Sequence, residues 1–125
     1  QRLHGATQVI AAIDARMAEV YIGRFALQQG LMHAETEELA VKPEALSAVN
    51  LTGEVYGVGT GWQTYAEQLL AKQQAKIAAD ILYPSAQDML TLALPALAAR
   101  QFIAAELAEP VYVRDEVTWK KLPGR

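Results

Sequence analysis

The sequence lacks cysteine and is poor in the other residues that build catalytic centres. With no cysteine among its 125 residues, it excludes a disulfide scaffold, thiolate catalysis and zinc sites with cysteine ligands. His4 and His33 share no ligand spacing with another metal-binding residue, and Ser47 and Ser85 lack the Gly-x-Ser-x-Gly context of a hydrolase nucleophile. We therefore expect no metal, no cofactor and no serine hydrolase.

Positive charge and long apolar runs are also scarce. Eleven Lys and Arg stand against 14 Asp and Glu, giving a net charge of -3, whereas proteins that bind duplex nucleic acid are normally strongly basic. No apolar run approaches the roughly 20 residues that a membrane span requires, and no signal segment opens the chain. The sequence predicts a cytoplasmic protein that has no membrane contact and does not bind nucleic acid directly.

What is present is an ordinary globular composition. Hydrophobic residues make up 52% of the chain and charged residues 20%, so a single domain with its own core is expected. The first residue is Gln1 rather than Met, which predicts that the chain is a processed or truncated fragment.

The first third of the chain reads as three strands. Residues 8–15 form a continuous apolar, β-branched run typical of a buried strand, and residues 19–27 alternate like a second strand. The polar turn 28–30, with Gly30 free to adopt a positive φ, leads to a third strand over 31–41. Its acidic residues mark that strand as a sheet edge.

Strands then alternate with helices. Pro43 suits the first turn of a short helix over 43–49, and residues 54–59 are strand-like. Thr60 is expected to cap a helix with one buried stripe, formed by Trp62, Tyr65, Ala66, Leu69 and Leu70.

The last part of the chain predicts one more strand and one more helix. The strand spans 75–82, and the helix runs from Ser85, paired with Asp88 in an acidic capping box, to about Phe102. Its expected buried face consists of Met89, Leu92, Ala93, Ala96 and Leu97. An extended segment, 109–114, and a basic tail, 119–125, follow.

This order, βββαβαβα, predicts an α/β domain with a mixed five-stranded sheet and helices on its faces. The same order occurs in one ribonuclease H-like half of an actin-like, or ASKHA, protein.

A glycine run, 57–61, lies between an expected strand and helix, where backbone N–H groups can hold a phosphate. The run lacks the Lys-Ser/Thr pair of a P-loop, and its glycine spacing does not fit a dinucleotide fingerprint. A tight strand-to-helix turn is therefore the favoured interpretation over a phosphate site.

Two carboxylates, Asp14 and Glu19, flank the first predicted turn. A general acid–base pair needs one raised pKa, and Arg16 between them acts in the opposite direction, so an ion-paired loop is expected. Trp119, Lys120 and Lys121 could stack on RNA or form a solvated tail. Composition and spacing alone lead to a soluble α/β domain without a catalytic set.

Four segments, in register along the chain, carry a family resemblance. They are 9–21 (Val-Ile-Ala-Ala-Ile-Asp-Ala-Arg-Met-Ala-Glu-Val-Tyr), 58–62 (Val-Gly-Thr-Gly-Trp), 83–90 (Tyr-Pro-Ser-Ala-Gln-Asp-Met-Leu), and 108–114 followed by 117–124 (Val-Thr-Trp-Lys-Lys-Leu-Pro-Gly). Together they resemble the C-terminal half of the TsaB family, also called YeaZ.

The resemblance implies that residues 1–125 are a C-terminal actin-like domain whose N-terminal partner domain is absent. It implies a non-catalytic subunit of the bacterial complex that forms N6-threonylcarbamoyladenosine at position 37 of tRNAs reading ANN codons. The implied partners are the catalytic paralogue TsaD and the ATPase TsaE, with homodimers possible and tRNA reached only through the complex.

Interface residues follow from the same resemblance. Arg16, Glu19 and Tyr21 are expected on the face turned toward the missing domain or the partners. Apolar area normally buried between the two halves is expected to make the fragment self-associate. The alternative function is a degenerate nucleotide-binding or glycoprotease-like (peptidase M22-like) enzyme.

Overall fold

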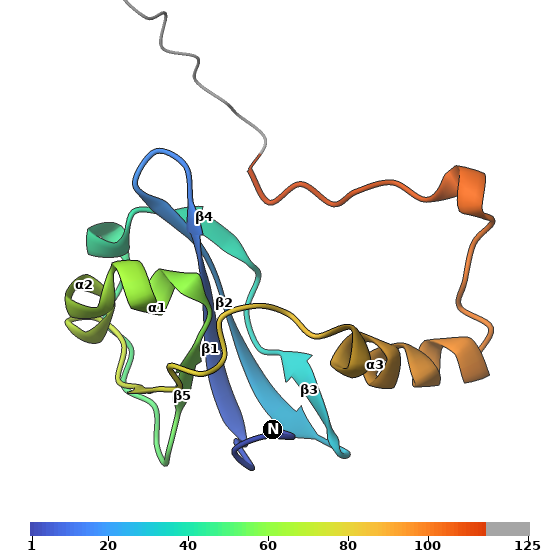
Figure 1. Ribbon diagram of the computed structural model, residues 1–125, viewed down its shortest axis with the longest axis horizontal. Helices are drawn as coiled ribbons and strands as arrows, with labels where there is room; N and C mark the ends of the chain where they lie inside the picture. The colour runs from blue at the N-terminus through green and yellow to red at the C-terminus, as the bar shows by residue number, and fades with distance from the viewer. Residues whose placement is uncertain (115–125) are drawn as a thin grey trace, which may run out of the picture.

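A mixed β-sheet forms the centre of the computed structural model, which describes residues 1–114 (Figure 1). Its strands are β1 (Gln8–Ala15), β2 (Glu19–Gln28), β3 (Leu31–Ala34), β4 (Leu39–Val41), β5 (Tyr56–Val58) and β6 (Lys76–Ile77). Their order across the sheet is β3-β2-β1-β5-β6, with β4 paired to the other end of β2. The mixed α/β class is therefore confirmed, although the sheet has six strands rather than the five predicted.

The long hairpin β1–β2 forms the middle of the sheet and agrees with the sequence prediction. The two strands pair antiparallel from Gln8 opposite Ala26 to Ala15 opposite Glu19. Met17 and Ala18 adopt positive φ values of 67° and 54°, which close the three-residue turn. β5 then pairs parallel to β1, and β6 pairs parallel to β5.

The predicted third strand over 31–41 is wrong in its middle. The chain leaves the ladder after β3 and returns as β4, so that both short strands pair with β2. Between them, the Thr36 hydroxyl accepts a hydrogen bond from the backbone N–H of Arg24 at 3.2 Å, in place of a strand carbonyl. Because this hydrogen bond replaces a contact of the strand ladder, the predicted edge strand is divided into two short strands. The edge position itself is confirmed, since β3 ends the strand order.

The predicted helices are shorter than expected. Residues 43–49 contain only a 3₁₀ turn at Pro43–Ala45. The helix expected from Thr60 is two pieces, α1 (Thr60–Thr64) and α2 (Ala66–Leu70), because Tyr65 between them leaves the helical region at φ −123° and ψ 34°. Gly59, not Thr60, is the N-cap residue.

The main core lies between one face of the sheet and these two short helices. Ile10, Ala12, Val20 and Ile22 project from that face and pack with Val55, Trp62 and Leu69. Trp62 is 1% exposed, and its indole N–H donates to the carbonyl of Ile10 at 3.0 Å. The buried stripe is thus confirmed at Trp62 and Leu69, whereas Leu70 is exposed.

The C-terminal part of the described chain differs most from the prediction. The strand expected over 75–82 is only β6, because a turn in which Ile81 donates its N–H to the Ala78 carbonyl interrupts it, although the Ile81 carbonyl still accepts the N–H of Gly59. The last helix is α3 (Ala86–Ala98), which begins at the predicted cap Ser85 and ends before Phe102.

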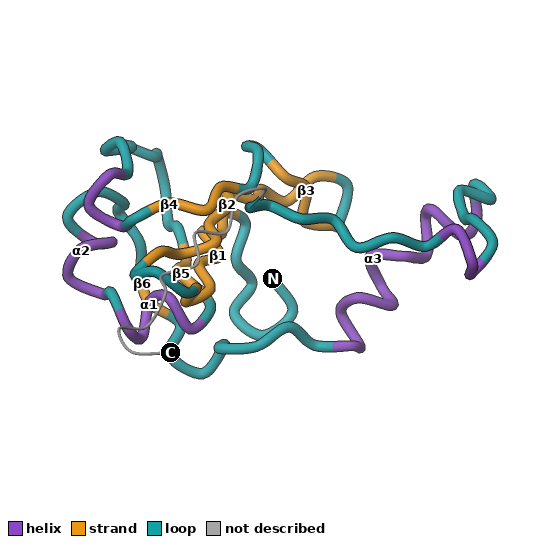
Figure 2. Tube along the Cα trace, turned by 90° about the horizontal axis from the view of Figure 1, so that it is seen from above, coloured by secondary structure: helices purple, strands orange, loops and turns teal. Residues whose placement is uncertain are grey.

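The expected buried face of α3 is also wrong, because none of its residues is buried. Helix α3 stands away from the sheet, followed by a 3₁₀ turn at Ala105–Leu107 and an extended segment that returns to the sheet at Arg114 (Figures 1 and 2). We call residues 84–114 the arm and residues 1–83 the body. Within residues 1–114, helices therefore cover one face of the sheet closely, and not both.

No helix in residues 1–114 is long and apolar enough to cross a membrane. The predicted basic tail, 119–125, lies outside the described residues.

Candidate protein-interaction surface

The turn of the β1–β2 hairpin brings the three predicted interface residues together. Arg16 is exposed in the turn, while Glu19 and Tyr21 are partly buried at the start of β2. Val20 between them points into the main core, so strand alternation places Glu19 and Tyr21 on the opposite face. The hairpin thus presents a carboxylate and an aromatic ring side by side.

Arg114 occupies this cluster from the end of the arm. Its guanidinium forms an ion pair with the Glu19 carboxylate and donates to the backbone carbonyl of Arg16 at 3.0 Å. The same group lies 5.4 Å from the centroid of the Tyr21 ring, a cation–π distance. The three predicted residues therefore form a receptor for one guanidinium, which we call the arginine pocket.

The arginine pocket is only moderately accessible to water. The side chain of Arg114 is 13% exposed and that of Glu19 is 23% exposed. The Arg114 Nε atom is buried without a hydrogen-bond partner among the described residues. The pocket binds the guanidinium through charge and ring contacts but leaves one of its donors unsatisfied.

Sequence reasoning missed Arg114 as a site residue. It is the last residue of the predicted extended segment, 109–114, and the one basic residue in that segment. Its distance of 95 positions from Glu19 hides the pairing from any local pattern.

The predicted ion-paired loop is wrong in its partners. Glu19 pairs with Arg114, and Arg16 contributes its backbone carbonyl rather than its side chain. Asp14 accepts a hydrogen bond from the Thr64 hydroxyl at 3.2 Å. Partial burial, together with the Asp14 carboxylate, raises the pKa of Tyr65.

The face of the sheet opposite the main core is hollow. Two cavities of about 580 and 410 Å³ lie along it and share Phe25 as a lining residue. The larger is bounded by the N-terminal lead, β3 and the start of the arm, with Val9, Leu31 and Leu92 in its wall. The smaller lies between Tyr21 and the segment that ends at Arg114. The two cavities therefore leave space in which further side chains could pack against this face of the sheet.

The glycine run, 57–61, serves close packing. A Cβ atom at Gly57 would lie 2.6 Å from the Trp62 ring, and one at Gly59 would lie 2.3 Å from the Ala12 carbonyl oxygen. Gly59 also adopts a φ of 102°, which side chains rarely tolerate. These contacts support the tight-turn interpretation, since helix α1 is a five-residue piece pressed onto β1.

The histidines do not assemble a metal centre. His4 lies 3.0 Å from both carboxylate oxygens of Asp80 and its ring is 5.5 Å from that of Tyr56, so the N-terminal lead is anchored. The His4 contact lowers the pKa of Asp80. No group of three potential metal ligands occurs in residues 1–114.

These features define a mixed α/β domain whose most elaborate polar site is an interaction surface on a hairpin. No protein-family model matches the chain. It is similar to the tRNA threonylcarbamoyladenosine biosynthesis protein TsaB of Escherichia coli (strain K12), with 44% identity over 129 residues that cover 99% of this chain and 55% of the relative. It is also similar to TsaB of Haemophilus influenzae (strain ATCC 51907 / DSM 11121 / KW20 / Rd), with 35% identity over 132 residues, 98% of this chain and 54% of the relative.

Solved structures give the same result. YeaZ from Pseudomonas aeruginosa matches with a TM-score of 0.77 and 42% identity, over 89% of this chain and 51% of that one. A crystal structure of a protein with similarity to peptidase YeaZ, from the same organism, matches at 0.79 and 42%, over 90% and 52%. The predicted resemblance is confirmed: this chain is similar to the TsaB (YeaZ) proteins along nearly all of its length. It spans about half the length of the curated relatives it matches.

Proposed function

We propose that residues 1–125 are the C-terminal, actin-like (ribonuclease H-like) domain of a TsaB-type protein. The 44% identity with TsaB over 99% of the chain, combined with a span of only about half the relative, supports this assignment. The mixed sheet built on a long hairpin is compatible with such a fold. In this proposal the protein is cytoplasmic, and its N-terminal domain belongs to the remainder of a longer chain.

The proposed activity is that of a non-catalytic subunit in the formation of N6-threonylcarbamoyladenosine at position 37 of tRNAs reading ANN codons. Its task is to bind TsaD and TsaE, with tRNA reached only through the complex. The name of the curated relatives supplies the pathway. The arginine pocket supplies a candidate contact surface, because it combines a charged group and an aromatic ring beside the hairpin turn, where Arg16 is exposed.

A co-purification with tagged TsaD, in the presence and absence of TsaE, tests this function. We expect the chain with Glu19→Lys to be retained at least fivefold less than the unmodified chain. Glu67→Lys makes the same charge change on exposed α2 and is expected to have no effect. Equal retention of the two variants would show that the hairpin is not part of the interface. If neither the unmodified chain nor either variant is retained, TsaD binding by this domain is contradicted.

The alternative is a degenerate nucleotide-binding or glycoprotease-like enzyme. The observation in its favour is the described similarity of one structural neighbour to a peptidase. Calorimetric titration of the chain with ATP and Mg²⁺ separates the two functions. The absence of a heat of ATP binding, together with retained TsaD binding, supports the subunit. Tight ATP binding that is lost on replacing Gly59 supports the enzyme.

A further inference from the structure

The turn of the β1–β2 hairpin carries backbone strain at two adjacent positions. Met17 and Ala18 have φ values of 67° and 54°, between the closing pair Ala15 and Glu19. In this region the Cβ atom of an L-residue is crowded against a neighbouring carbonyl oxygen. Hairpin turns with positive φ therefore favour glycine, asparagine or aspartate, and neither residue of this turn belongs to that group.

The next hairpin of the same sheet has a less strained turn. β2 and β3 are joined by Gln29 and Gly30, whose φ values are 50° and 81°, so one of the two positive values falls on a glycine. In the β1–β2 turn both values fall on residues with side chains, and Met17 is a large apolar residue. Since a tight turn of this sheet accommodates glycine, the fold itself does not require methionine at position 17.

Met17 does not belong to the cores of the body. It is absent from both clusters of buried apolar residues, and its side chain is 40% exposed. The turn lies at the end of the hairpin, clear of α1 and α2 (Figure 1). Strained residues are concentrated at functional sites, where the side chain has a role beyond packing in its own domain. The strain at Met17 therefore indicates a contact made outside the body.

The arginine pocket holds this turn in place. Arg114 donates to the backbone carbonyl of Arg16 at 3.0 Å and forms an ion pair with Glu19, so one guanidinium binds both sides of the turn. A turn that is fixed before binding loses little conformational freedom on association. Residues 16–18, which we call the tip, are therefore presented in a preorganised conformation.

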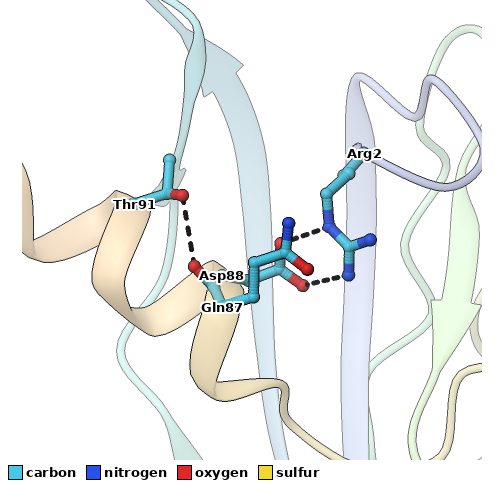
Figure 3. Close-up of polar contacts among 4 residues, drawn as sticks. All are labelled: Arg2, Gln87, Asp88 and Thr91. Atoms are coloured by element: carbon cyan, nitrogen blue, oxygen red, sulfur yellow. Dashed lines mark hydrogen bonds and ion pairs between the residues drawn. The ribbon is translucent and has the colours of Figure 1, made fainter.

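The tip also carries a positive charge that is available to a partner. Within residues 1–114, the exposed guanidinium of Arg16 has no hydrogen-bond or ion-pair partner. Arg2, by contrast, donates to both carboxylate oxygens of Asp88, at 2.6 and 3.0 Å (Figure 3). The charge at the tip is complementary to an acidic surface.

We propose that the tip inserts Met17 into an apolar pocket of a partner protein, with Arg16 facing acidic side chains at the rim of that pocket. Methionine suits this contact because its unbranched, polarizable side chain adapts to the shape of an apolar pocket. Methionine and arginine are also enriched at protein interfaces. The inference rests on the proposed function, in which the partner is TsaD, and adds the residue that makes the apolar contact.

Substitutions that relax the turn and remove the apolar side chain test the proposal. Met17→Asn and Met17→Gly are expected to raise the midpoint of urea unfolding, because both residues tolerate a positive φ better than methionine. In co-purification with tagged TsaD and TsaE, both variants are expected to be retained about tenfold less than the unmodified chain. A variant that is more stable but binds less cannot have lost binding through unfolding.

Two matched variants separate the side chain from the backbone. Ala18→Gly relaxes the adjacent residue without changing Met17, so it is expected to raise the unfolding midpoint and leave retention unchanged. Met17→Leu keeps an apolar side chain of similar volume and is expected to be retained within about twofold of the unmodified chain.

A second pair of variants tests the charge. Arg16→Glu is expected to lower retention, and the loss is expected to decrease at high salt because the contact is electrostatic. Lys42→Glu makes the same charge change at another exposed position and is expected to have no effect.

The outcomes distinguish this proposal from the proposed function. Retention of Met17→Asn and Met17→Gly equal to that of the unmodified chain would overturn the proposal and leave TsaD binding intact. A lower unfolding midpoint for both variants would also overturn it, since methionine would then stabilise the turn. If the unmodified chain is not retained, the proposed function is contradicted and this proposal with it.

Discussion

Arg114 and Glu19 lie 95 positions apart in the sequence and form an ion pair at the turn of the β1–β2 hairpin. The contact fastens the end of the arm to a strand whose other neighbours are fixed by backbone ladders. Because both side chains are mostly buried there, removing either one leaves a desolvated charge. The accessibility of the C-terminal end of the arm is therefore expected to depend on this ion pair.

Limited proteolysis measures that dependence. We expect Glu19→Gln to increase the rate of tryptic cleavage after Arg114 about fivefold in dilute solution, since trypsin needs a released arginine side chain. The factor corresponds to a coupling of about 1 kcal/mol for a partly solvated pair. The matched variant Glu67→Gln is expected to leave the rate unchanged. An unchanged rate in Glu19→Gln would show that the ion pair does not hold the arm.

Replacement of Gly59 by alanine is expected to destabilise the protein by more than about 3 kcal/mol. The new Cβ would combine an unfavourable backbone conformation with a contact of 2.3 Å to the Ala12 carbonyl oxygen. Gly30→Ala is the control, because Gly30 also has a positive φ but open space around it, and we expect about 1 kcal/mol. Urea denaturation gives both values. Similar losses at the two positions would contradict the close-packing role of Gly59.

Trp62 is expected to be the most sensitive core residue. Trp62→Ala removes a side chain that is 1% exposed and is expected to cost about 3–5 kcal/mol. Trp62→Phe keeps most of the volume but leaves the Ile10 carbonyl without its indole donor, for about 1–3 kcal/mol. Tyr83→Ala, at a 75% exposed position, is expected to change the free energy of unfolding by less than about 0.5 kcal/mol.

The His4–Asp80 contact predicts a loss of stability in acid. Its hydrogen bond lowers the folded pKa of Asp80 below the ordinary value of 3.8. The stabilisation is therefore complete above pH 3.8 and is lost as the pH falls through the lower, folded pKa. Arg2 lowers the pKa of Asp88 in the same direction, so the two contacts weaken over the same range.

Denaturation of the unmodified chain and of Asp80→Asn between about pH 6 and pH 2 checks this expectation. The stability difference between the two proteins should be constant near neutrality and shrink below pH 3.8. The exposed-site variant Glu67→Gln supplies the baseline. A difference that grows as the solution is acidified would have the wrong sign for a lowered pKa.

Local sequence signals predicted the elements that local physics controls. The β-branched run 8–15 and the alternation after Glu19 gave the hairpin, and the turn before Leu31 gave the start of β3. The glycine run was correctly favoured as a tight turn. Each of these depends on side-chain alternation or backbone conformation within a few residues.

Elements that depend on distant partners were predicted less well. The acidic capping box at Ser85 was expected to engage Asp88 locally, yet Asp88 binds Arg2, 86 positions away. The apolar stripe of α3 predicted burial, but no surface of residues 1–114 covers it. The strand over 31–41 was broken by a hydroxyl contact between Thr36 and Arg24 that no periodicity reveals.

The sequence by itself determined the class of the domain, the hairpin that organises it and its similarity to TsaB, because these depend on short-range patterns and on motifs that keep their order along the chain. Only the tertiary structure decided that Arg16, Glu19 and Tyr21 meet one guanidinium, and that α3 stands apart from the sheet. The physical reason is that an ion pair is selected by the three-dimensional approach of its charges, whereas a strand or a turn is selected by neighbouring residues.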